Sequence, residues 1–261
     1  MRMLRRLLVA SLSLVSTACT TFYDAPPEDD LKKDTAADAH AAWGRVLAAN
    51  VDAEGRVAFD RLAASRDFKT YIAYIGRESP IAQPEKFPTP QATLAELLNQ
   101  YNALAMYGVV KTGEREGFTT FFKRLGFFKL TEFRMGGREI SLYDLENDVV
   151  RPMGDPRVHT ALNCMSTGCP RLPQKPYTAA GLDRELDAGA REFFNKTKYV
   201  QVDASRRVAR LSEILKFFTG DFVNSKQATS LIAYVNRYRR DKIPEDYAVE
   251  FIPYDWALFK Q

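Results

Sequence analysis

Hydrophobic residues recur at helical spacing over several stretches of the chain. The clearest stretch follows Thr89-Pro90, where apolar residues return every three or four positions from Leu94 to Val109. This spacing predicts a helix over residues 91–111, with Thr89 as its N-cap and Pro90 in its first turn. By the same criterion we expect helical segments over the ranges 35–49, 59–76, 118–128, 141–150, 179–195, 212–218 and 226–239.

Short runs of alternating apolar and polar residues predict strands between these helices. Residues 130–135 and 138–140 flank Gly136-Gly137, a pair typical of a two-residue hairpin turn. A second hairpin is expected from residues 199–202 and 208–211, a last strand over 249–252, and another strand over 157–162, which alternates loosely. Helices interleaved with hairpins predict an α+β fold, with helices packed around a small antiparallel sheet.

The N-terminus has the features of a secretion signal. Arginines precede a short apolar run, and residues 16–18 are small, so residues 1–18 are expected to be removed. Cys19 follows directly, as in a bacterial lipoprotein cleavage box, although Ser16 stands where such boxes usually carry Leu. We expect lipidation of Cys19, a membrane anchor, a polar tether over 19–34 and a single domain over 35–261. Plain cleavage after residue 18 is the alternative.

Thr20, rather than Asp, follows the expected lipidation site. By analogy with bacterial lipoproteins, this residue predicts sorting to the outer membrane with the domain facing the periplasm. The net charge of +4 is mild, and Lys and Arg are scattered among Asp and Glu, so we expect no nucleic-acid partner. An unidentified small molecule or peptide is the expected ligand.

Residues 155–170 hold one of the two histidines and two of the three cysteines. His159 lies in the expected strand, and Cys164 and Cys169 lie in the loop after it. Four interpretations are open: a thiol nucleophile with His159 as its base, a Cys164–Cys169 disulfide, a metal site such as zinc, and inert buried thiols. We expect no cofactor, because only three metal-ligand candidates lie together and no C-x-x-C pair occurs.

Polar residues on two of the predicted helices are further candidates for this site. Asn99 and Asn102 lie three apart beside the apolar stripe of the long helix. Asn102 either bonds a neighbouring backbone or reaches the cysteine site as a polarising amide. Glu146 either faces solvent or pairs with His159 or an arginine. His40 lies on an Ala-rich helix and is expected to face solvent.

Five segments, taken together and in order, resemble the domain of unknown function 547 family. They are the ranges 98–104, 140–146, 157–164, 166–170 and 253–256, and the resemblance extends over about residues 51–256. The family occurs in bacterial envelope proteins and in plant and animal proteins, and no activity is settled for it. A polar-lined helix followed by a His-bearing strand is also similar to papain and transglutaminase-like folds.

The chain departs from the family pattern at three positions. Leu98 stands in place of an aromatic residue, Asn147 in place of a histidine, and Met165 in place of a glycine. The absent second histidine argues against a metal or two-histidine mechanism, whereas both thiols are kept.

Two functional hypotheses follow. In the first, the protein is a thiol-dependent hydrolase or acyltransferase. Cys169 or Cys164 is then the nucleophile and His159 the base, with Asn102 as polariser and Glu146 orienting His159. In the second, it is a non-catalytic envelope binding module shaped by a Cys164–Cys169 disulfide.

Overall fold

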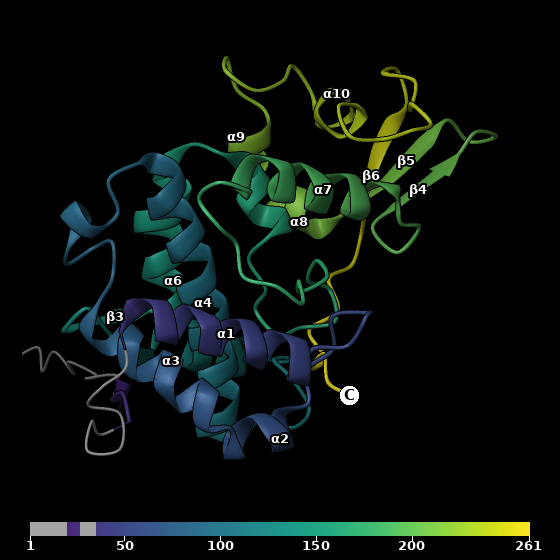
Figure 1. Ribbon diagram of the computed structural model, residues 1–261. Coiled ribbons are helices and arrows are strands. Elements are labelled where there is room, and N and C mark those ends of the chain that lie inside the picture. The colour runs from purple at the N-terminus through teal and green to yellow at the C-terminus, as the bar shows by residue number, and fades with distance from the viewer. Residues whose placement is uncertain (1–19, 27–34) are drawn as a thin grey trace, which may run out of the picture.

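The computed structural model describes residues 20–26 and 35–261 (Figure 1). The predicted signal segment 1–18, Cys19 and residues 27–34 of the predicted tether lie outside the described residues. The α-helices are α1 Ala36–Asn50, α2 Phe59–Ala64, α3 Arg66–Arg77, α4 Pro90–Thr112, α5 Phe121–Arg124, α6 Leu142–Asp144, α7 Leu182–Asn195, α8 Glu213–Phe217, α9 Thr219–Phe222 and α10 Leu231–Asn236.

Short 3-10 and π segments connect or extend several of these helices. They are the 3-10 segments η2 Pro84–Lys86, η5 Arg151–Met153 and η6 Pro156–Thr160, and the π segments η3 Leu125–Lys129 and η4 Leu145–Val150. The predicted helix over 118–128 is therefore α5 continued by η3, and that over 141–150 is α6 continued by η4. The helix predicted over 226–239 is shorter than expected, because only α10 within it is helical.

The sequence-derived starts of the main helices are explained by their caps. Thr89 accepts a hydrogen bond from Ala92 N–H, with Pro90 in the first turn of α4, and Gly113 ends that helix with φ of 68°. Gly is favoured there because the left-handed conformation costs it little. Thr35 and Asp38 form a capping box at the start of α1. These predictions of the helices over 35–49 and 91–111 are confirmed.

The strands form two small sheets rather than one. In the first, β1 Thr21–Tyr23 pairs in parallel with β2 Thr131–Met135, which pairs antiparallel with β3 Arg138–Ser141. In the second, β4 Val200–Asp203 pairs antiparallel with β5 Val208–Ser212, which pairs in parallel with β6 Ala248–Ile252. The α+β class and both predicted hairpins are confirmed. The expectation of a single antiparallel sheet is wrong, because both three-stranded sheets are mixed.

The first sheet includes residues 21–23 of the segment predicted to be a tether. Thr21 N–H donates to Leu130 O at 2.8 Å, so the segment just after Cys19 is bound to the domain as an edge strand. Thr, Phe and Tyr all favour β-structure, a signal that the position beside a leader concealed.

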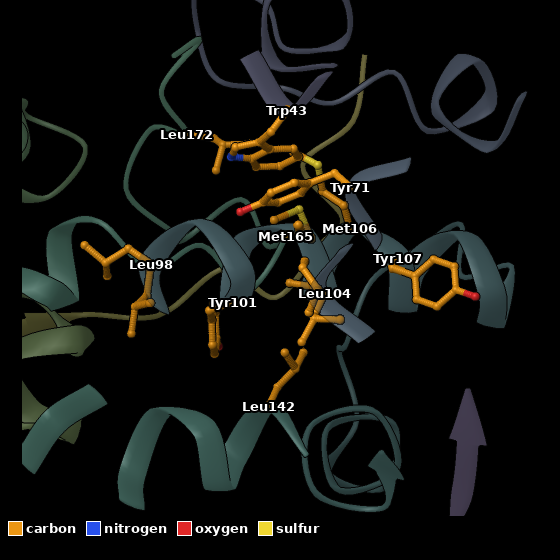
Figure 2. Close-up of a cluster of buried hydrophobic side chains, with 14 of the residues drawn as sticks. Trp43, Tyr71, Leu98, Tyr101, Leu104, Met106, Tyr107, Leu142, Met165 and Leu172 are labelled. Atoms are coloured by element: carbon orange, nitrogen blue, oxygen red, sulfur yellow. The ribbon is translucent and has the colours of Figure 1, made fainter. Parts of the chain in front are cut away.

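The hydrophobic core has two clusters, which α7 joins. The larger surrounds α4, which is buried along most of its length and carries Leu98, Tyr101 and Leu104 among the side chains shown in Figure 2. The smaller covers the second sheet. Leu186 of α7 belongs to the first cluster and Phe194 to the second, so the helix spans both. Figure 1 shows α1, α3 and α4 on one side of the molecule, and α7, α10 and the second sheet on the other.

His40 is half-buried rather than solvent-facing as expected. Its Nε2 lies 2.6 Å from Glu96 Oε2, and its ring lies edge-on to Tyr74 at 5.2 Å between centroids. The hydrogen bond to Glu96 raises the pKa of His40 above its ordinary value.

Among the described residues, no helix is both long and apolar enough to cross a membrane.

Candidate functional site

His159 lies in the short 3-10 helix η6, not in the strand predicted over 157–162. Asp155 caps this helix by accepting a hydrogen bond from Arg157 N–H, and Pro156 occupies its first turn. An Asp-Pro pair satisfies the first-turn requirements of a helix, so it prevailed over the loose alternation that followed. The turn buries His159, which is 3% exposed.

The two cysteines lie in the loop over residues 163–170, and asparagine side chains fix the shape of this loop. Asn163 Nδ2 donates to Pro170 O at 2.8 Å, and Asn163 Oδ1 accepts from Met165 N–H at 2.7 Å. Asn102 of α4 donates to Ala161 O at 3.1 Å and accepts from Asn163 N–H at 2.8 Å. Both groups of the Asn102 amide are therefore occupied by the backbone around the loop.

Met165 has a backbone conformation that explains one departure from the family pattern. Its φ is 65°, in the left-handed region that glycine adopts at little cost. For methionine this conformation costs roughly 1 kcal/mol or more. The side chain is only 1% exposed and lies among the core side chains of Figure 2. Burial of this side chain offsets the cost and anchors the loop to the core.

The two thiols face each other within the loop. Cys164 Sγ lies 2.9 Å from Cys169 Sγ, and both thiols are free. Cys164 N–H donates to Cys169 Sγ at 3.0 Å. The hydroxyl of Tyr254 lies 3.1 Å from Cys164 Sγ and 2.9 Å from Cys169 Sγ. The two sulfurs and this phenol form one hydrogen-bonded group.

The C-terminal segment delivers Tyr254 to this group. Gly168 N–H donates to Asp255 O and Thr167 N–H donates to Ala257 O, each at 2.7 Å. A Cβ atom on Gly168 would lie 2.8 Å from the Tyr254 ring, so only glycine fits there. Glu213 accepts from Tyr254 N–H at 2.8 Å. The position of the phenol is thus fixed by backbone contacts at Tyr254 itself and at Asp255.

Glu146 of η4 contacts Tyr101 and lies near His159. Tyr101 OH donates to Glu146 Oε2 at 3.3 Å, and Glu146 Oε1 lies 4.0 Å from His159 Nδ1. Burial, reinforced by the charge of Cys164, raises the pKa of Glu146 to about 7. This carboxyl group can therefore hold or release a proton near neutral pH.

His159 pairs with a carboxylate instead of a thiol. Its Nε2 lies 2.7 Å from Asp221 Oδ2, and Arg151 Nε also donates to this oxygen at 2.7 Å. The ring stacks on Phe218 at 4.0 Å between centroids. Burial lowers the pKa of His159, although Asp221 opposes this effect. Neither cysteine sulfur is a hydrogen-bond partner of His159 among the described residues.

The pKa values of the two thiols move in opposite directions. Burial alone would raise the pKa of Cys164, but hydrogen bonds with Cys169, Ser166 and Tyr254 outweigh it and lower the value to about 7. Burial and the neighbouring Cys164 raise the pKa of Cys169 well above the ordinary range. Cys164 is half-buried, whereas Cys169 is 2% exposed. Cys164 is therefore the thiol with the chemistry of a nucleophile.

A cavity of about 340 Å³ joins these groups. Cys164, Cys169, Glu146 and His159 all contribute to its walls. Aromatic and aliphatic side chains form most of the remaining surface, and Arg124 and Lys129 supply cations. The other lining residues are Tyr101, Phe121, Leu125, Phe128, Tyr143, Asn147, Leu162, Pro170, Ile214, Phe217, Phe218, Tyr254 and Trp256. The cavity suits an apolar group bearing one reactive polar centre.

The structure thus brings together most of the residues predicted for the site. His159, Cys164, Cys169 and Glu146 share one cavity, whereas Asn102 supports the loop from behind. Sequence reasoning missed Asp221, Tyr101 and Tyr254 as members of the site. Tyr254 lies in the segment 253–256 that carried part of the family resemblance, so a signal was present for that residue. Within residues 20–26 and 35–261, no group of three His, Cys, Asp or Glu side chains is arranged to hold a metal ion.

Comparison with known proteins finds one family model that matches the central part of the chain. Residues 85–194 match the model of the family described as "Protein of unknown function, DUF547". This segment contains α4, η4, η6 and the cysteine loop, so the match covers most of the cavity wall. It includes neither Tyr254 nor Asp221, the partner of His159. It is also shorter than the resemblance over residues 51–256. No curated protein and no solved structure matches the chain significantly.

Proposed function

We propose that this protein is a thiol-dependent hydrolase or acyltransferase that uses Cys164 as its nucleophile on an amide or thioester bond. The supporting observation is the pairing of two thiols of opposite character in one cavity. The half-buried Cys164 has a pKa near 7, so about half of it is thiolate at neutral pH. The buried Cys169 stays protonated and donates a hydrogen bond to it.

The proposed reaction begins with attack of the Cys164 thiolate on the substrate carbonyl carbon. A sulfur–carbon bond forms, the amide or thioester bond breaks, and protonated Glu146 supplies the proton that the leaving amine or thiol requires. Water, or an acceptor nucleophile, then attacks the acyl-enzyme and returns a proton to Glu146. The Cys164 thiolate is released as the acyl group leaves.

The roles of the remaining residues follow from their contacts. His159 is 4.0 Å from Glu146 and has no hydrogen bond to either sulfur, so we assign it to positioning this carboxyl rather than to deprotonating the thiol. Tyr254 contacts both sulfurs and can donate to the Cys164 thiolate before attack and again when the acyl group leaves. Asn102 is removed from the list of polarising groups, because its amide is bonded to backbone.

We also propose that the protein acts in a bacterial envelope as an outer-membrane lipoprotein facing the periplasm. This proposal depends on the leader-like residues 1–18 and the adjacent Cys19, which would carry the lipid and make the membrane the partner of the chain. The ligand remains a small molecule or peptide, and the lining of the cavity favours one with an apolar acyl or aromatic group.

The second candidate is a non-catalytic binding module in which Cys164 and Cys169 form a disulfide. The separation of 2.9 Å between the sulfurs favours it, because a small movement would bring them to bonding distance. An oxidising compartment would promote that bond. The cavity would then hold a ligand without reacting with it.

Alkylation of the unreduced protein at neutral pH, followed by intact mass, separates the two candidates. With Cys19 lipidated or replaced by Ser, the thiol catalyst predicts one adduct, on Cys164, that is lost in Cys164→Ser and kept in Cys169→Ser. A bridged protein would be lighter by two hydrogens and unlabelled. For the free-thiol form, a thioester carrying a phenylalkyl acyl group should leave that acyl group on Cys164. Normal labelling without any acyl transfer would count against the proposed reaction class.

A further inference from the structure

The most exposed large hydrophobic side chains in the described part of the chain lie side by side on α5. Phe122 is 80% exposed and Phe121 is 62% exposed. They begin the segment 121–129, Phe-Phe-Lys-Arg-Leu-Gly-Phe-Phe-Lys, which carries three cations and no acidic residue. Adjacent exposed phenylalanines rarely remain in water without a partner surface.

This aromatic surface continues along the cavity containing Cys164. Phe121 lines that cavity, and so do Phe217 and Tyr143, which are 47% and 44% exposed. Phe121 and Phe122 lie edge-on to each other at 5.7 Å between ring centroids, and Phe217 lies 5.9 Å from Tyr254. Exposed aromatic rings from three separate parts of the chain therefore gather where the cavity meets solvent.

The cations of the segment stand among these rings. The Arg124 guanidinium lies over the Trp256 ring at 4.8 Å, and Lys129 Nζ lies over the Tyr143 ring at 4.6 Å. Lys123 pairs with Glu114 at 3.1 Å and with the exposed Glu116 at 3.4 Å. Phenylalanine beside Lys and Arg on a short helix is the composition of segments that lie in a membrane interface.

The N-terminal strand β1 lies next to this segment. Thr21 pairs with Thr131, and its N–H donates to Leu130 O, the residue that follows η3. Thr21 and Lys123 line a common groove of about 240 Å³. Cys19 precedes Thr21 by only two residues, which span at most about 7 Å. A lipid on Cys19 would therefore hold the bilayer close to α5.

We propose that residues 121–129, together with Phe217 and Tyr143, form a surface that inserts into the headgroup region of an anionic bilayer. The cations match the charge of such headgroups, and the phenylalanines enter the boundary with the acyl chains. The mouth of the cavity then lies against the membrane. The proposal uses the anchor on Cys19 but does not depend on the thiol chemistry.

Trp256 provides a local probe of this contact, because it lies beside Arg124 and 6.2 Å from Phe128 between ring centroids. The full chain, isolated with its native N-terminus, is reconstituted into vesicles that contain brominated lipids. Quenching of tryptophan fluorescence is measured in wild type and in a Trp256→Phe variant, which gives the contribution of the buried Trp43. The test variant is Phe121→Ser/Phe122→Ser, and the matched control is Val202→Ser/Val249→Ser, at exposed positions of the second sheet.

We expect clear quenching of Trp256 in the wild type, stronger with anionic than with zwitterionic lipids. Quenching in the phenylalanine variant should be about threefold or more weaker than in the wild type, and the valine variant should match the wild type. Thermal unfolding followed by circular dichroism checks that both variants fold. Equal quenching in both variants, or none in the wild type, would overturn the proposal. So would a wild-type dimer, seen by light scattering without vesicles, that dissociates only in the phenylalanine variant, because the surface would then be covered by a second copy.

Discussion

His159 Nε2 lies 2.7 Å from Asp221 Oδ2, although the two residues are 62 positions apart in the sequence. Arg151 binds both oxygens of the same carboxylate, and both partners hold the pKa of Asp221 well below its usual range, against the effect of burial. The imidazole is therefore fixed on a permanently charged group. The other ring nitrogen, Nδ1, faces Glu146 at 4.0 Å. The His159–Asp221 pair therefore lies next to the Glu146 carboxyl group and not next to a thiol.

Replacing Asp221 with Asn should lower the pKa of His159 further. Burial already places this pKa below 6.5, and the variant removes the charge that opposes the effect. The signal of the imidazole C2 proton in NMR gives the pKa directly. His40 is an internal reference, because its pKa is raised through Glu96 and should not respond to the substitution.

The lowered pKa of His159 also predicts how the stability of the protein depends on pH. Because the folded protein binds the His159 proton less tightly than the unfolded chain, the contribution of this residue to stability falls as the pH drops below about 6.5. Asp221→Asn should steepen that fall. An imidazole of His159 that titrates above 6.5 would contradict the assignment.

Alkylation of Cys164 by iodoacetamide should speed up with pH around a midpoint near 7. Cys169→Ala removes a hydrogen bond to the thiolate, so the midpoint should rise. Cys169→Ser keeps a hydroxyl donor and should shift the midpoint less. Rates measured from pH 5 to 9 on all three proteins provide the test. A midpoint that ignores Cys169 would show that the sulfurs do not interact in solution.

Glu146→Gln should separate the role of Glu146 as a proton donor from the effect of its charge on the pKa of Cys164. The neutral amide removes a negative charge near Cys164, so the alkylation midpoint of that thiol should fall. Turnover of a thioester substrate should nevertheless drop by about 10²–10⁴-fold, because the proton donor is gone. Faster alkylation combined with lost turnover identifies Glu146 as a proton carrier. Unchanged turnover would remove it from the mechanism.

The raised pKa of Glu146 also predicts a dependence of stability on pH. Between about pH 4.5 and 7 the folded protein keeps a proton that the unfolded chain has released. The stability of the wild type should therefore decline as the pH rises through this window, by about 1–3 kcal/mol from this group. Glu146→Gln should lack that part of the decline. Urea denaturation at pH 5 and pH 8 measures the difference.

Asn102→Ala should destabilise the protein by about 2–4 kcal/mol, because it leaves two buried backbone groups without partners. The affected groups are Ala161 O and Asn163 N–H. Asn195→Ala is the matched control: its amide also bonds to backbone, through Arg191 O, Tyr238 O and Arg240 N–H, but at an exposed position. The control should cost about 1 kcal/mol or less. If urea denaturation shows equal losses of unfolding free energy in the two variants, the buried position of Asn102 gives the cysteine loop no extra support.

The sequence predicted those parts of the fold that depend on local signals. The Thr89-Pro90 start of α4 and the Gly136-Gly137 turn act within a few residues, so both were predictable. Met165 stands where the family pattern has a glycine, and its positive φ shows that the backbone still needs the left-handed conformation there. Burial of the methionine side chain offsets the cost of that conformation. The Asp155-Pro156 pair could have revealed the helical turn at His159.

Contacts between distant segments were beyond local signals. Spacing placed His159 and the cysteines near one another, but only the tertiary fold turns the imidazole toward Asp221 and brings Tyr254 to the sulfurs. Pairing of β1 with β2 depends in the same way on a neighbour more than a hundred positions away. Which carboxylate a histidine selects is determined by packing rather than by periodicity.

The backbone bonds from Gly168 to Asp255 and from Thr167 to Ala257 have a consequence for how the chain matures. Nearly a hundred residues must be synthesised after Cys164 before Tyr254 exists to cover the sulfurs. A nascent chain therefore presents both thiols uncovered to any oxidant or disulfide-exchanging chaperone that it meets. Folding of the last few residues closes that interval, so a chain truncated before Tyr254 would keep both sulfurs open to oxidation.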